Sequence, residues 1–239
     1  MARTDPSKVL FLDIETVPQT YNWADMDTRT QVLFSDKTRH ERERDGKTDA
    51  EMHRDKGGIL SEFGKIICIG VGFLTASKTD RKLRVKTIHG DDEQAVLTEF
   101  VTLLNERFHT ADHKLCGHNG KEFDFPYIAR RCVIHGIPLP LQLDIAGKKP
   151  WEVQHEDTLE LWKFGDRKHY TSLELLTHVL GIPSPKGDIK GSDVARVYYE
   201  DKDLDRIAEY CKKDVVATVQ VYLRLRGLPL IATDNITLV

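Results

Sequence analysis

The sequence lacks the usual signs of a secreted, membrane-bound or zinc-thiolate protein. Only four cysteines occur among 239 residues, at positions 68, 116, 132 and 211, and no two have the CxxC spacing of a metal or redox motif. They are expected to be buried free thiols in a reducing compartment. The first residues contain no apolar signal segment, and no apolar run is long enough to span a bilayer. We therefore expect a cytoplasmic protein.

Neither sign of charge is in large excess. The formal net charge is -3, although charged residues make up 31% of the chain. This balance gives no overall attraction to nucleic acid, so such a partner would need a local basic patch or bound metal ions. The hydrophobic content of 40% is enough for one sizeable core.

Apolar runs come early in the chain, and helical patterns follow. The patterns predict strands at 8–14, 65–74, 83–89 and 114–117, and helices after Asp92, at 123–135, 172–180 and 204–226, with a short one from Ser192. This order indicates an α/β or α+β sheet with helices packed against it.

A strongly polar segment separates the first two predicted strands, from about residue 19 to 60. Its part at 36–56 holds seven Lys or Arg and seven Asp or Glu. Mixed charge of this kind is typical of a solvated helix or a mobile excursion. We therefore expect a single domain over residues 1–239, with an insertion at about 19–60.

Asp13 and Glu15 end the first predicted strand. Alternation along a strand places both side chains on one face. Two carboxylates so close repel each other unless a cation lies between them, and oxygen ligands suit Mg²⁺ or Mn²⁺. The alternative is a strand that ends in solvated acids.

Tyr210 and Asp214 lie four residues apart and share a face of the last predicted helix. They flank its apolar stripe, where an acid needs a partner that a metal would supply. The alternative is a tyrosine in the core beside a surface acid.

The stretch 117–131, GHNGKEFDFPYIARR, predicts a tight turn at Gly117 and Gly120 followed by a helix. Asp124 falls at the start of that helix, where a negative charge is favourable in any case.

Three segments together carry a resemblance: FLDIET, HNGKEFDFP and YCKKD, in this order. They resemble the three exonuclease motifs of the DEDD superfamily, in its Tyr branch. In the His branch a histidine lies five residues before the final acid, and here that residue is Glu209. The chain is most similar to stand-alone predicted 3′–5′ exonucleases related to the proofreading domain of family B DNA polymerases. The resemblance covers roughly residues 8–226 and implies a ribonuclease-H-like fold, a five-stranded mixed sheet with helices on both faces.

The resemblance also implies the site. It assigns metal binding to Asp13, Glu15, Asp124 and Asp214, which would hold two Mg²⁺ or Mn²⁺ ions, and it makes Tyr210 a catalytic residue. Two such ions would activate a water and stabilise the leaving 3′ oxygen of a phosphodiester. A tyrosine with an ordinary pKa near 10 is a poor base, so we expect Tyr210 to orient the water.

The expected substrate is the 3′ end of single-stranded nucleic acid, with DNA favoured. Strand ends are held by stacking and phosphate contacts. Candidates are Asn119, Lys121, Phe123 and Phe125, although the aromatic rings could belong to the core. Lys163, Arg167, Lys168 and His169 form either a second contact with the backbone or an ordinary charged loop. An exoribonuclease and a non-cleaving single-strand-binding module remain alternatives. Any replication or repair partner would be a separate chain.

Overall fold

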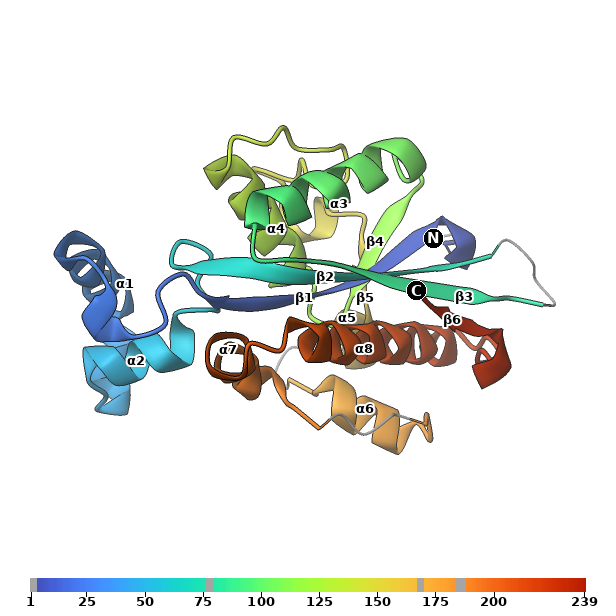
Figure 1. Ribbon diagram of the computed structural model, residues 1–239. Coiled ribbons are helices and arrows are strands. Elements are labelled where there is room, and N and C mark those ends of the chain that lie inside the picture. Colours follow the sequence, from blue (N-terminus) through green and yellow to red (C-terminus); the bar gives the residue numbers. More distant parts are fainter. Residues whose placement is uncertain (1–3, 76–79, 167–169, 184–187) are drawn as a thin grey trace.

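The computed structural model describes residues 4–75, 80–166, 170–183 and 188–239, and its centre is a mixed six-stranded sheet. The strand order is β5-β4-β1-β2-β3-β6. The strands are β1 Val9–Pro18, β2 Gly64–Leu74, β3 Leu83–His89, β4 Lys114–Gly117, β5 Glu156–Asp157 and β6 Ile236–Leu238. The β1–β2 and β2–β3 pairs are antiparallel, and the other three pairs are parallel. The predicted mixed α/β sheet is confirmed, but its five strands become six because the C-terminal β6 pairs with β3 (Figure 1).

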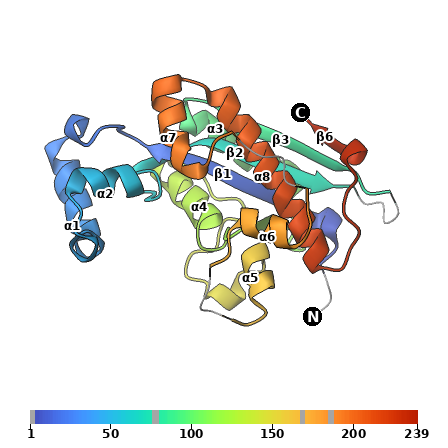
Figure 2. The ribbon, with the colours of Figure 1, turned by 90° about the horizontal axis from the view of Figure 1, so that it is seen from below.

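Helices cover both faces of this sheet. α3 and α4 lie on one face, and the long α8 crosses the other with α5, α6 and α7 nearby (Figures 1 and 2). The helices are α1 Thr28–Asp45, α2 Asp49–Lys56, α3 Glu93–Arg107, α4 Asp124–Ile134, α5 Thr158–Lys163, α6 Leu173–Val179, α7 Val194–Arg196 and α8 Leu204–Leu225. Single turns complete them: the 3-10 turns η1 Pro6–Lys8, η2 Trp23–Asp25, η3 Pro150–Glu152, η4 Gly191–Asp193 and η6 Thr233–Asn235, and the π-turn η5 Val197–Asp201. The predicted helices after Asp92 and at 123–135, 172–180 and 204–226 are confirmed within one or two residues.

β1 divides its side chains between the two helical layers. Leu10 and Leu12 belong to the core under α3 and α4, whereas Val9 and Phe11 belong to the core under α8. This alternation follows from the period of two in a strand. The odd positions therefore face α8, and the next of them is Asp13.

A glycine in β2 lets α8 approach the sheet closely. Gly70 pairs with Asp13, and a Cβ at Gly70 would lie 2.7 Å from Cys211 Sγ and 2.8 Å from Val215 Cγ2. Any larger residue would push α8 away. The middle of α8 thus lies over the strand position that carries Asp13.

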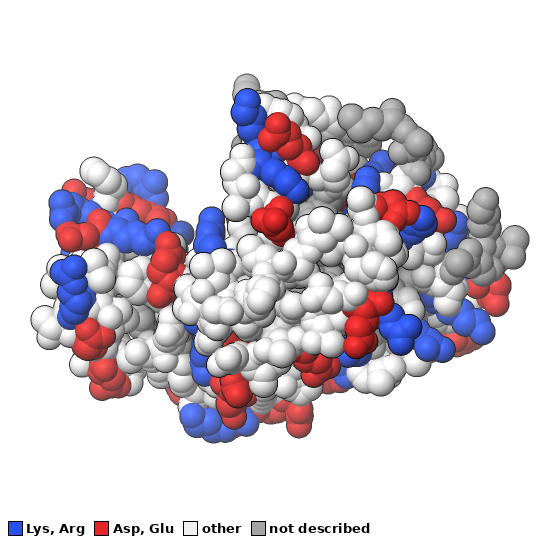
Figure 3. Space-filling model, turned by 90° about the horizontal axis from the view of Figure 1, so that it is seen from above, with Lys and Arg blue, Asp and Glu red and all other residues white. Residues whose placement is uncertain are grey.

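The polar segment between β1 and β2 forms α1 and α2, which make a lobe beside the sheet (Figure 1). The lobe has a small core of its own, with Phe34, Met52 and Phe63 buried. On the face drawn in Figure 3, acidic and basic side chains intermingle over this lobe, in keeping with the balanced charge of the segment. The single-domain organisation with an insertion at about 19–60 stays a prediction.

All four cysteines are buried and carry free thiols, as predicted. Within the described ranges, no helix combines the length and the apolar character that a membrane crossing requires.

Candidate active site

The acidic part of β1 meets the middle of α8. Because β1 continues to Pro18, beyond the predicted strand at 8–14, Asp13 and Glu15 lie within the strand and not at its end. Asp13, Glu15 and Cys211 each place a donor atom within 4.8 Å of the other two. Glu15 is only 7% exposed, and the described residues offer its carboxylate no hydrogen bond and no ion pair. Burial of an acid without a partner is costly, so a group of this kind calls for a positive charge from elsewhere.

Asp124 reaches the same strand from the start of α4. Pairing of β1 with β4 ends at Phe11 and Cys116, and Asp124 Oδ1 then accepts the N–H of Ile14, at 3.1 Å. Asp124 is 4% exposed. Burial raises the pKa of its carboxyl to about 7, although the N–H groups of Asp124 and Ile14 act in the opposite direction. The carboxylate thus lies beside the β1 backbone at Ile14, where its charge acts on Asp13.

A further acid, Asp157, fixes the loop that leads to Asp124. Its two oxygens accept the N–H groups of Asn119 and Lys121, both at 3.0 Å, and one of them caps α5 through Leu159 at 2.9 Å. Asn119 has the left-handed φ of 65° that such a tight turn requires. Asp157 was not among the residues predicted from the sequence, although its place before a helix is a capping signal.

Tyr210 and Asp214 complete the group from α8. Burial raises the pKa of Asp214 to about 6, an effect that the Tyr210 hydroxyl opposes by donating to it. Burial, followed by the charges of Asp214, Glu15 and Asp13, raises the pKa of Tyr210 well above its usual range. The hydroxyl therefore keeps its proton at any physiological pH and acts as a donor.

The two acids of β1 also titrate abnormally. Burial, and then the charges of Asp214 and Asp124, raise the pKa of Asp13 well above its usual range. Glu15 behaves in the same way because of burial and the charge of Asp13. The structure thus gathers all four acids that the sequence proposed. A divalent cation fits this set because it would offset the repulsion and satisfy the bare carboxylate of Glu15.

Cys211 is the neighbour that the sequence analysis missed. It was noted only as part of the apolar stripe of the last helix, yet its Sγ donates to the backbone oxygen and to Oδ2 of Asp13, both at 3.5 Å. The sequence offered only its place beside Tyr210, because the glycine that faces it, Gly70, is brought there by the fold.

The residues predicted to contact the substrate are less well placed for that role than the acids are for theirs. Phe125 is fully buried in the core beneath α4, so stacking on a base is wrong for this residue, and its core alternative holds. Phe123 is partly buried with its ring 5.3 Å from that of Tyr127. Lys121 Nζ pairs with Glu160 at 2.8 Å. Lys163 ends α5, whereas Arg167, Lys168 and His169 lie outside the described residues.

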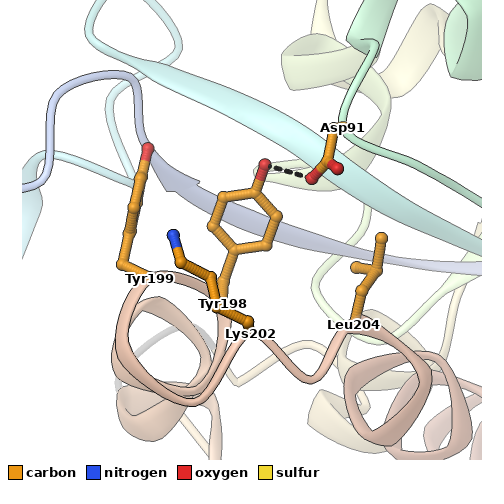
Figure 4. A pocket seen from close by; sticks show the side chains of 5 residues that line it. All are labelled: Asp91, Tyr198, Tyr199, Lys202 and Leu204. Carbon is orange, nitrogen blue, oxygen red and sulfur yellow. Dashed lines mark hydrogen bonds between the residues drawn. The ribbon is translucent and has the colours of Figure 1, made fainter.

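A separate pocket lies at the beginning of α8. It has a volume of about 320 Å³ and is lined by Asp91, Tyr198, Tyr199, Lys202 and Leu204. Tyr198 donates to Asp91 at 2.7 Å across this pocket (Figure 4). None of the lining residues was proposed from the sequence, and none belongs to the acidic group.

Known proteins similar to this chain agree with this architecture. A family model described as a predicted 3′–5′ exonuclease related to the exonuclease domain of PolB matches residues 60–230, which hold Asp124, Tyr210 and Asp214 but not the acids of β1. The DNA polymerase of Pyrococcus glycovorans is 22% identical over 142 residues, which are 54% of this chain and 18% of the polymerase. DNA polymerase 1 of Pyrococcus abyssi is 25% identical over 117 residues, or 44% of this chain and 15% of that one.

A solved structure extends the comparison to the fold. The family B DNA polymerase from the archaeon Pyrobaculum calidifontis superposes with a TM-score of 0.55 and 17% identity, over 93% of this chain and 26% of that one. The predicted ribonuclease-H-like α/β fold is thereby confirmed.

Proposed function

The chain belongs to the family of predicted 3′–5′ exonucleases related to the exonuclease domain of PolB, and we propose that it hydrolyses single-stranded nucleic acid from the 3′ end with divalent cations. DNA is the favoured substrate, because the curated relatives are DNA polymerases. These relatives are far longer than the shared region, so their polymerase activity is not transferred to this chain.

One observation carries the proposal above all others. Glu15 is only 7% exposed, its carboxylate has no hydrogen-bond or ion-pair partner among the described residues, and its donor oxygen lies within 4.8 Å of one on Asp13. A site of this kind would repel the phosphates of a nucleic acid strand unless cations were bound. That argues against the alternative of a non-cleaving strand-binding module.

The residues divide the work among three elements. Asp13 and Glu15 from β1, Asp124 from α4 and Asp214 from α8 would hold two Mg²⁺ or Mn²⁺ ions. When bound, these ions supply an activated water and stabilise the leaving 3′ oxygen. The protonated hydroxyl of Tyr210 orients the attacking water, and Asp157 holds the loop that carries Asp124 in place.

Three residues are proposed to contact the nucleic acid strand. Phe123 remains a candidate for stacking because it keeps part of its surface exposed, and Asn119 and Lys121 remain candidates for polar contacts. Partnership with separate replication or repair proteins and a cytoplasmic location stay predictions from the sequence alone.

The function is tested with 5′-labelled single strands of DNA and RNA of one sequence. With Mn²⁺ or Mg²⁺ we expect a ladder of shortened DNA products, and none with chelator. The same strand closed into a circle is the control, because it has no 3′ end. Cleavage of the circle at a comparable rate would refute exonuclease action, and faster shortening of RNA would make the protein an exoribonuclease.

A further inference from the structure

We propose that Cys211 turns part of the acidic site into a binding site for a thiophilic divalent cation, of which Zn²⁺ and Cd²⁺ are the test cases. Its sulfur would bind such an ion together with the carboxylates of Asp13 and Glu15, in competition with Mg²⁺ or Mn²⁺. The competition rests on the proposed function, whereas the thiophilic site itself can be tested without it.

The distances suit a small tetrahedral ion. Three donor atoms that lie no more than 4.8 Å apart leave a central point within about 2.8 Å of each. Zinc takes sulfur at about 2.3 Å and carboxylate oxygen at about 2.0 Å, so only small side-chain shifts are needed. A tetrahedral ion with those bond lengths would separate its sulfur and oxygen by about 3.5 Å. The observed separation of Cys211 Sγ from Asp13 Oδ2 is 3.5 Å.

The fold holds the thiol in this place. Cys211 is fully buried between α8 and the sheet, and the missing side chain of Gly70 provides the room for its sulfur. A second observation points to a ligand independently of the cysteine. Glu15 is more than nine-tenths buried, and no donor in the described part of the chain reaches its carboxylate.

The chemistry separates the two classes of cation. Mg²⁺ demands oxygen ligands in octahedral geometry, so it gains nothing from a thiol. Zn²⁺ and Cd²⁺ bind thiolate strongly. On binding, the proton of Cys211 passes to the solvent, and the hydrogen bond from its sulfur to Asp13 gives way to bonds from both groups to the ion. Water can fill the fourth position. The result is an ion that holds Asp13 and Glu15 and is slow to leave.

Cadmium titration of the metal-free full-length protein tests the site directly, because a Cd²⁺–thiolate bond absorbs in the ultraviolet. We expect a saturable charge-transfer band that disappears in Cys211→Ser and in Cys211→Ala. It should persist in Cys132→Ser, whose cysteine lies in the core under α4, and in Cys116→Ser, whose cysteine lies in the core with Phe11 and Tyr222. Glu15→Gln should keep the band at saturation but weaken the affinity about tenfold or more, since it removes a ligand and leaves the sulfur.

The outcomes separate this site from the proposed function. Mn²⁺ binding is followed in parallel on the same samples, and circular dichroism confirms that each variant is folded. Mn²⁺ binding without any cadmium band overturns the role of Cys211 and leaves the nuclease proposal intact. A band that survives in both Cys211 variants, or that is lost in Cys116→Ser, also overturns it. A Cys211-dependent band in a protein without nuclease activity supports the site and refutes the function.

Discussion

Two buried glutamates, on opposite faces of one sheet, show what distinguishes a structural acid from a functional one. Glu93 is 6% exposed and Glu15 is 7% exposed. Glu93 accepts from Arg131 Nε at 2.8 Å and from the N–H of Ile66 at 2.7 Å, and His135 Nε2 lies 2.8 Å away. The carboxylate of Glu15 has no such donor in the described ranges.

The pKa values of the two groups move in opposite directions as a result. Burial by itself would raise the pKa of Glu93, but the hydrogen bonds from Arg131, Ile66 and His135 lower it. Burial and the charge of Asp13 raise the pKa of Glu15. Glu93 thus has its positive partner within the chain, whereas Glu15 must receive one from outside it.

The largest effect is expected at the acid that the cluster surrounds. Asp13→Asn removes a charged ligand with almost no change of shape, and we expect nuclease turnover to fall by about 1000-fold or more. The exposed acid Asp234 gives a matched control, because Asp234→Asn makes the same chemical change at the surface. Steady-state cleavage of a labelled strand measures both. Normal cleavage by Asp13→Asn would show that Asp13 is not needed for catalysis and is a structural acid like Glu93.

For the structural acid, Glu93, we expect an effect on the stability of the fold. Arg131→Met leaves Glu93 buried without its main counter-ion, and we expect a loss of about 3–5 kcal/mol of unfolding free energy. Adding Glu93→Leu should recover part of the loss, because it removes the stranded charge. Urea denaturation compares the three proteins. A loss below about 1 kcal/mol would mean that Arg131 is not the main counter-ion of Glu93.

Tyr210→Phe tests whether the Tyr210 hydroxyl contributes to catalysis. It keeps the ring but removes the hydroxyl, so cleavage should slow by about 10–1000-fold while Mn²⁺ affinity hardly changes. Tyr222→Phe, in the same helix but in the core beside Phe11, should cleave at the normal rate. Equal activity of both variants would assign Tyr210 to the core.

The pH dependence of the metal-free protein should show the smallest effect. The pKa of Asp124 is raised to about 7 and that of Asp214 to about 6, so the folded state binds these protons more tightly than the unfolded state. Stability is therefore highest while both groups are protonated, and it falls as the pH rises toward 7. We expect a lower melting temperature at pH 7.5 than at pH 5.5 without metal. Saturating Mg²⁺ should reverse this order, because it binds the ionised acids. Parallel behaviour with and without Mg²⁺ would contradict the account.

Much of the framework could be predicted from the sequence, because long segments with a regular apolar pattern carry a strong local signal. β2, β3, α3 and α8 each combine a clear apolar pattern with a cap or a turn. The parts that were missed have little local signal. β5 has two residues and β6 has three, and both exist only because a neighbouring strand offers an edge.

The site shows a similar limit. The order of the motifs pointed to Asp13, Glu15, Asp124 and Asp214, although of these only Asp124 stands at the end of an element. The spacing could not separate a stacking ring from a core ring at Phe125, because both uses suit an aromatic residue at the start of a helix. Nor could it reveal Cys211, whose position near Asp13 depends on the close approach of α8 to Gly70.

The most direct test of the central claim is Mn²⁺ binding, measured by calorimetry on the wild-type protein, on Glu15→Gln and on Glu99→Gln. Glu99 is the control, because it is an exposed acid that pairs with Lys86. We expect Mn²⁺ binding by the wild type and by Glu99→Gln, and an affinity lower by about tenfold or more in Glu15→Gln. Equal binding by all three proteins, or none by the wild type, would contradict it.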